Sequence, residues 1–262
     1  MLSCVVYAGG MYGSSHIIPT LLSALRQFAE ALLELIWPTR CVGCEKLGVL
    51  LCDNCEKALP HIDPHEACPR CGAPFGRLVC TECTTVYEAQ PKDMPFTQTC
   101  CALEFNELSR NIIIAYKDGG ERRLGALLAH MMAQAMHTEW QQWADLLTWI
   151  PADEDAVRRR GFDHMAQIAV GIAQRLNMPI APLLEKRPHE DQRSLGREGR
   201  KLNMQKAFSL YEGAEERMGV AIRNVVLVDD VFTTGATLSA AAQVLLDGGA
   251  AEVRVLTMYR VW

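Results

Sequence analysis

The chain has 262 residues, a formal net charge of −5, 49% apolar and 22% charged residues. This length accommodates one medium domain with an attached module, and the composition is that of an ordinary globular protein. No stretch approaches the roughly 18 apolar residues that span a bilayer, and the acidic balance argues against a surface that binds nucleic acid everywhere. A local basic excess remains, because residues 158–206 hold 11 Lys and Arg against 5 Asp and Glu.

The first 36 residues form a variable N-terminal segment with one expected helix. Residues 1 to about 20 predict no clear element, and we expect disorder or an overextended start. Apolar residues at helical spacing between Leu21 and Ile36 predict a helix that packs on its own protein. A membrane-surface helix is the less favoured interpretation, because its polar face carries little positive charge.

Eight of the 11 cysteines form four Cys-x-x-Cys pairs in two sets. The first set has the spacing C-x2-C-x7-C-x2-C and the second C-x2-C-x8-C-x2-C; the ligands are Cys41, Cys44, Cys52, Cys55, Cys68, Cys71, Cys80 and Cys83. Such spacing favours tetrahedral thiolate zinc sites, which four protein ligands close and thereby make structural. Pairing across the two sets, one or two ions, an iron–sulfur cluster, disulfides and apolar burial stay open. We leave His61 and His65 off the ligand list.

The thiols predict a reducing compartment, because no secretory signal precedes them, and we expect a cytoplasmic protein without membrane insertion. The composition changes near Phe96. We therefore predict a Cys-rich zinc module over residues 37–92 and a second domain over residues 96–262.

The second domain alternates expected strands and helices. Strands are expected at 146–150 and 251–261, and a charged loop with Arg158, Arg160 and Gly161 precedes a helix, in a setting suited to a phosphate group. Lys117, expected on a loop, is a further candidate for an anionic ligand, although a solvated lysine is the default. Residues 186–208 are polar and basic, as in a flap over a site or a segment without function.

The stretch NVVLVDDVFTTGATL, residues 224–238, organises this domain. Its aliphatic run predicts a strand buried on both faces, which ends at Asp229 and Asp230. A hydroxyl-rich turn then leads into a helix, and its residues are Thr233, Thr234, Gly235, Ala236 and Thr237. Backbone N–H groups and a helix N-terminus at one point suit a phosphate. Ordinary turn and helix-cap preferences explain only part of this pattern.

This stretch resembles the ribose-phosphate signature of type I phosphoribosyltransferases. The collinear order of W-P-x-x-C-x-x-C, the CxxC pairs, YKDGG, P-x8-RGF, Q-x2-L-x4-R-x2-N-x4-F and VDDVFTTGAT also resembles the competence protein F (ComF/GntX-like) family from about residue 37 onward. The resemblance implies an α/β fold, a type I phosphoribosyltransferase-like parallel sheet flanked by helices, behind a small zinc module. Asp163 and His164 depart from it, since family members commonly have Asn and Gln there.

The resemblance also implies roles for residues. Asp229 and Asp230 would hold the ribose hydroxyls of phosphoribosyl pyrophosphate with Mg²⁺, residues 233–237 its 5-phosphate, and the arginine loop its pyrophosphate, with Gln192, Arg200 and Asn203 on a closing flap. A transferase is one hypothesis; a non-catalytic protein that binds single-stranded DNA, or that docks a DNA-uptake protein through the zinc module, is the other.

Overall fold

The computed structural model describes residues 34–35, 38–76, 78–81, 83–84, 94–187, 207–214 and 223–261. Most of the predicted N-terminal helix and the predicted flap residues Gln192, Arg200 and Asn203 lie outside these ranges. The chain divides into two compact units, Met1–Cys52 and Asp53–Trp262. The domain boundaries predicted at residues 37, 92 and 96 stay a prediction.

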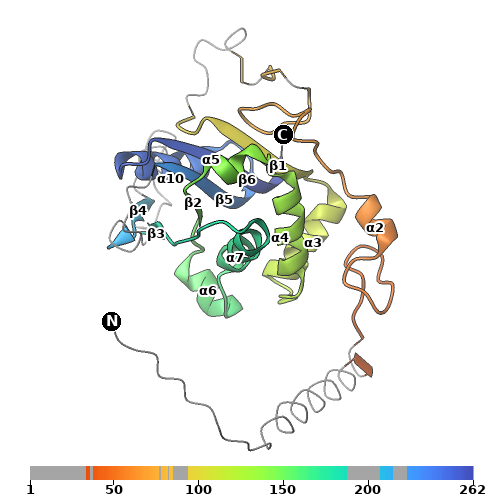
Figure 1. The fold of residues 1–262 in the computed structure, drawn as a ribbon. Coiled ribbons are helices and arrows are strands. Elements are labelled where there is room, and N and C mark those ends of the chain that lie inside the picture. The colour runs from red at the N-terminus through yellow and green to blue at the C-terminus, as the bar shows by residue number, and fades with distance from the viewer. Residues whose placement is uncertain are drawn as a thin grey trace, which may run out of the picture. The chain divides into compact units, whose positions relative to one another are not determined.

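A four-stranded parallel sheet lies at the centre of the second unit, in the order β1-β6-β5-β2 (Figure 1). Its strands are β1 (Gln98–Glu104), β2 (Leu146–Trp149), β5 (Asn224–Phe232) and β6 (Glu252–Arg260). Most residues of the central strands β5 and β6 are buried, as expected where helices cover both faces. The predicted fold class is therefore confirmed.

Helices α3 (Glu107–Lys117), α4 (Leu124–Ala135) and α7 (His164–Leu176) lie on one side of the sheet, and α10 (Ala236–Asp247) lies on the other (Figure 1). Short helices α2 (Asp53–Lys57), α5 (Glu139–Trp143) and α6 (Glu154–Arg160) join these elements. A capping box begins α3, because Asn106 accepts the N–H of Ser109 while the Ser109 hydroxyl accepts the N–H of Asn106.

A separate antiparallel pair consists of β3 (Leu184–Lys186) and β4 (Phe208–Leu210). These strands flank the predicted flap in sequence, so the two ends of that segment lie side by side. The register pairs Lys186 with Phe208.

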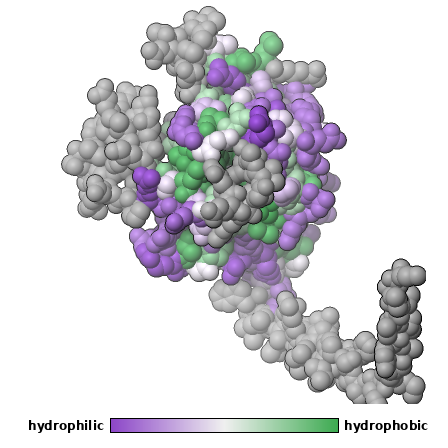
Figure 2. Space-filling model, turned by 60° about the vertical axis from the view of Figure 1, so that its left-hand side comes forward, coloured by the Kyte–Doolittle hydropathy of each residue, from purple (hydrophilic) through white to green (hydrophobic). Residues whose placement is uncertain are grey.

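Buried apolar residues of α10, β5 and β6 form one hydrophobic cluster, which also contains all four cysteines of the second set. Hydrophobic residues gather near the middle of the face in Figure 2, bordered by hydrophilic ones. Among the described residues, none of the helices has the length and apolar character needed to cross a membrane.

Candidate functional site

The two predicted acids lie in the second half of β5. The strand runs four residues past Val228, because β6 continues to pair with it as far as Phe232 and Arg260. The expectation that the strand stops at the acids was therefore wrong. The neighbouring strand β2 does end there, with Trp149 opposite Val228 as its last pair. Asp229 and Asp230 thus lie just beyond the carboxyl end of β2, and ligands of open parallel sheets bind near the carboxyl ends of the strands.

Asp229 is buried, with 8% of its surface exposed. Its Oδ1 accepts the backbone N–H of Asp230 at 2.9 Å. Burial raises the pKa of Asp229 to about 7, against the opposing effects of Lys117 and Lys186. A carboxyl group with this pKa changes charge near neutral pH, which is unusual for an aspartate and common at functional sites.

Lys117 forms an ion pair with Asp230 through Nζ and Oδ2. It is the last residue of α3, so its predicted place on a loop was wrong. The preceding residue, Tyr116, fixes this end of the helix, because its buried hydroxyl donates to the carbonyl of His164 at 2.8 Å. Burial lowers the pKa of Lys117 to about 8, while Asp229 opposes this shift.

His164 is a site residue that the sequence reasoning named only as a departure from a family pattern. Its Nε2 lies 3.4 Å from Oδ2 of Asp230, and only 8% of its side chain is exposed. Burial, followed by the charges of Lys117 and Arg160, lowers its pKa to about 3, so the imidazole is neutral at pH 7. Within the described part of the chain, its buried Nδ1 has no hydrogen-bond partner.

The predicted arginine loop is instead a short helix, α6, which ends at Gly161 with a φ of 77°. Side chains at i, i+3 and i+4 meet on a helix, so Arg158 bonds Asp155 and Glu154 and stays largely exposed. Arg160 is mostly buried and pairs with Asp118 at 3.2 Å. Its charge acts on both Lys117 and His164, so Arg160 belongs to the site more clearly than Arg158 does.

Asp163 caps the N-terminus of α7. One carboxylate oxygen accepts the N–H groups of Met165 and Ala166 at 2.9 and 3.1 Å. Two such bonds satisfy donors that the helix itself leaves unpaired. The second carboxylate oxygen accepts the indole N–H of Trp149 at 3.4 Å, so both oxygens of Asp163 have partners within the protein.

The predicted phosphate loop follows β5 and leads into α10. Thr233, Thr234 and Thr237 are exposed, and Gly235 precedes the first turn of the helix with a φ of 76°. A Cβ on Gly235 would lie 2.9 Å from the Phe232 ring, so a side chain is excluded twice, by conformation and by contact. The three threonines are thus exposed at the start of α10, where the N–H of Ala236 donates to Oγ1 of Thr234 at 3.4 Å.

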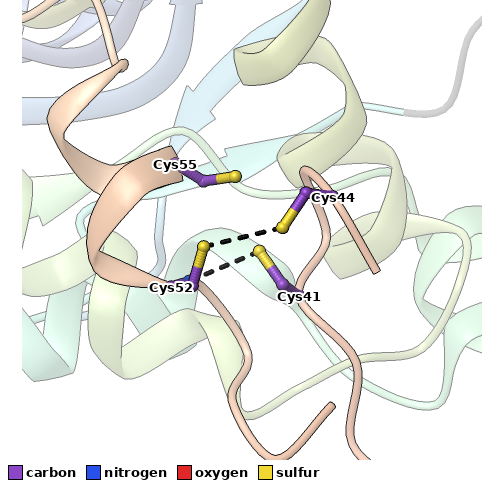
Figure 3. Close-up of side chains that lie close together, drawn as sticks. All are labelled: Cys41, Cys44, Cys52 and Cys55. Atoms are coloured by element: carbon purple, nitrogen blue, oxygen red, sulfur yellow. Dashed lines mark hydrogen bonds between the residues drawn. The ribbon is translucent and has the colours of Figure 1, made fainter. Parts of the chain in front are cut away.

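The first cysteine set brings Cys41, Cys44, Cys52 and Cys55 together, with their sulfur atoms pointing toward one another (Figure 3). Sγ of Cys44 and Cys52 lie 3.6 Å apart, and the N–H of Cys52 donates to Sγ of Cys41 at 3.3 Å. Cys44 is exposed and Cys55 is half-buried.

The second set gathers Cys68, Cys71, Cys80 and Cys83, all buried. It repeats the geometry of the first, with 3.6 Å between Sγ of Cys71 and Cys80 and a 3.3 Å bond from the N–H of Cys80 to Sγ of Cys68. A hydrogen bond with Cys71, against the effect of burial, lowers the pKa of Cys68 to about 4 and favours the thiolate.

Each set therefore supplies one complete group of ligands, and pairing across the sets is excluded for the described cysteines. The ligand atoms of each group lie within 4.8 Å of one another, which fits four thiolates around one tetrahedral zinc. His61 and His65 belong to neither group.

Comparisons with known proteins define the class. Residues 32–86 match the double zinc ribbon domain, and residues 166–261 match the phosphoribosyl transferase domain. The protein thus joins a double zinc ribbon, with two structural zinc sites, to a domain of the phosphoribosyltransferase fold.

Full-length relatives give a more particular assignment. The chain is 25% identical over 213 residues to the competence protein ComFC of Bacillus subtilis (strain 168), covering 80% of this chain and 84% of the relative. It is 27% identical over 214 residues to the DNA utilization protein YhgH of Escherichia coli (strain K12), covering 80% and 90%. The protein is a homologue of ComFC and YhgH, which confirms the family resemblance.

Among solved structures, orotate phosphoribosyltransferase from Aeropyrum pernix aligns with 61% of this chain and 80% of its own, at 14% identity and a TM-score of 0.33. This similarity is too low to carry a conclusion about the site.

Proposed function

We propose that this protein binds phosphoribosyl pyrophosphate, or a related nucleotide, with Mg²⁺ at the end of β5. The observation that carries this proposal is the convergence of an acid pair, a lysine, an arginine and a hydroxyl-rich helix N-terminus on one edge of a parallel sheet. Carboxylates accept hydrogen bonds from sugar hydroxyls, and the cationic and N–H groups bind phosphate.

The residues divide naturally between the parts of such a ligand. Asp229 and Asp230 would accept the ribose hydroxyls, and Thr233–Thr237 would surround the 5-phosphate. Lys117 and Arg160 would neutralise the pyrophosphate. Because Lys117 contacts Asp230, ligand binding would exchange this ion pair for bonds to the ligand.

Mg²⁺ fits the chemistry of this donor set, since carboxylate oxygens are the hard ligands that it prefers. When bound with the ligand, Mg²⁺ would neutralise charge on the pyrophosphate. The protein's own contribution is to orient the ribose through the two aspartates and to hold the phosphate at the start of α10.

The names of the relatives connect this site to DNA. ComFC is a competence protein and YhgH a DNA utilization protein. We therefore propose that the site serves the uptake or reuse of DNA or of its nucleotides, either as a transferase or as a sensor that binds without catalysis. In the second case the protein itself, or a partner docked on the zinc ribbons, would contact single-stranded DNA.

Calorimetric titration of the zinc-loaded protein with phosphoribosyl pyrophosphate and Mg²⁺ tests the proposal. We expect saturable binding that the Asp229→Asn, Asp230→Asn double variant loses and that Asp247→Asn, an exposed acid at the other end of α10, retains. Binding that survives the double substitution would contradict the assigned site, and a complete lack of binding to the folded protein would overturn the proposal.

The DNA-binding alternative has a different signature. Anisotropy of a labelled single-stranded oligonucleotide should show affinity that falls steeply with salt, because phosphate contacts release counterions. Binding that is insensitive to salt would argue against contact with the DNA backbone.

A further inference from the structure

Arg260, the last residue of β6, is a buried cation outside the proposed ligand contacts. Only 2% of its surface is exposed, and it lies opposite Phe232 in the register of β5 and β6. Burying a guanidinium group is costly unless its donors are bonded and its charge is compensated. The groups around Arg260 therefore indicate what the residue is for.

The guanidinium group of Arg260 holds two distant segments at once. Its Nε donates to the carbonyl of Cys71 at 2.8 Å. Its Nη1 donates to the carbonyls of Thr233 at 3.2 Å and Phe232 at 3.5 Å, and the group lies 4.7 Å from the centre of the Phe232 ring. One planar fork thus joins a ligand of the second cysteine set to the first residue of the proposed phosphate loop.

Metal binding gives this arrangement a direction. Cys71 is one of four ligands that would hold a single Zn²⁺, and its carbonyl accepts from Nε of Arg260. Bound metal would thus hold the backbone that orients the guanidinium group. Removing the metal releases Cys71 from this constraint, and the bonds of the same guanidinium group to Phe232 and Thr233 shift with it.

We propose that Arg260 is a positioning residue that couples metal binding at the second cysteine set to the conformation of Thr233–Thr237. With zinc bound, the guanidinium group fixes the Phe232 and Thr233 carbonyls and so presents the loop for a phosphate. The consequence for ligand affinity rests on the proposed function, but the coupling between metal and loop does not.

Hydrogen exchange measures this coupling without a ligand. We compare amide exchange of residues 233–237 in full-length protein with zinc and after chelation, using exchange within α7 as the internal reference for global folding. In the original protein, zinc removal should speed exchange of the loop about tenfold more than it speeds exchange of α7, as expected for a local effect in addition to any loss of global stability.

Three variants identify the residue responsible. Arg260→Met should show fast loop exchange even with zinc bound, and Arg260→Lys should restore part of the protection, since an ammonium group can reach some of the carbonyls. Arg254→Met is the matched control, because Arg254 lies on the same strand, is largely buried, and bonds Glu252 and stacks on Trp143. It should retain the protection seen in the original protein.

Calorimetry with ribose 5-phosphate separates this inference from the proposed function. Arg260→Met should weaken that ligand about tenfold, or roughly 1.4 kcal/mol. If loop exchange responds to zinc but the protein binds no ribose 5-phosphate, the coupling is supported and the ligand assignment is contradicted. Normal binding with loop exchange that is indifferent to zinc and to Arg260→Met overturns the coupling and leaves the ligand assignment standing.

Discussion

The two cysteine sets have the same internal geometry and very different surroundings. In both, the N–H of the third cysteine donates to the sulfur of the first at 3.3 Å. The first set leaves Cys44 exposed, whereas the second is wholly buried in a hydrophobic cluster with α10 and the central strands. Ligand spacing therefore determines the geometry of the metal site. The contacts around the site determine whether it stabilises only its own loop or also the core of a domain.

The largest effect on stability is expected when one ligand is removed from each set. Cys68→Ser should destabilise the phosphoribosyltransferase-like domain by about 3–5 kcal/mol, because it breaks a buried, charged cluster within the core. Cys44→Ser should change the unfolding of that domain by less than about 0.5 kcal/mol, as for exposed sites. Urea unfolding monitored by tryptophan fluorescence measures both. Equal losses would contradict the comparison.

A substitution in the acid pair should change stability in the opposite direction from Cys68→Ser. Because burial raises the pKa of Asp229 to about 7, its contribution to stability is greatest at low pH and is lost as pH rises through 7. Asp229→Asn should thus be more stable than the original protein above neutral pH, by up to about 4 kcal/mol.

The pH dependence checks this assignment. The stability gained by Asp229→Asn should widen by about 1.4 kcal/mol between pH 6 and pH 8 and then level off, as one proton requires. Urea midpoints at three pH values provide the measurement, with Asp247→Asn as the control. A gain that is independent of pH would show that Asp229 does not titrate in this range.

Chelation distinguishes the two metal sites by rate. Exposure of Cys44 gives a chelator access to the first set, so its zinc should leave at least about tenfold faster than zinc of the second set, whose release requires local opening. Release followed with a chromogenic chelator should therefore be biphasic. Cys44→Ser should remove the fast phase of zinc release. If it removed the slow phase, the first set would be the slowly releasing site, contrary to this prediction.

The smallest expected effect concerns a residue away from both sets. Asp163→Asn keeps a good helix cap and removes one negative charge near the proposed pyrophosphate group. The affinity for phosphoribosyl pyrophosphate should rise about twofold to fivefold at low salt, less at high salt, with zinc release unchanged. Calorimetry at two salt concentrations tests this, and a lower affinity would show that the carboxylate assists the ligand.

The sequence predicted those features that adjacent residues encode. Cysteine spacing predicted the eight ligands but left open how they pair, which the structure shows as two separate groups. The DDVFTTGAT stretch predicted a loop and a following helix after the acids. It misjudged the end of β5, because pairing with β6 prolongs that strand past the acids. It also could not bring Lys117 to Asp230, since their contact depends on how α3 lies against the sheet.

Arg260 was missed for the same reason. Nothing near it in the chain signals a buried cation, and its partner Cys71 is 189 residues away. The departures at Asp163 and His164 were visible in the sequence, but only the structure shows that one caps a helix and the other contacts the acid pair.

The distance along the chain between Cys71 and Arg260 also bears on synthesis. The first set spans 15 residues, 41–55, and can close around its metal soon after it leaves the ribosome. The four ligands of the second set, residues 68–83, follow soon afterwards, but their burial is complete only when β6 (Glu252–Arg260) pairs with both β1 and β5. During translation the cysteines of the second set are therefore exposed until the end of the described chain has been made. Early zinc binding would protect them from oxidation throughout that interval.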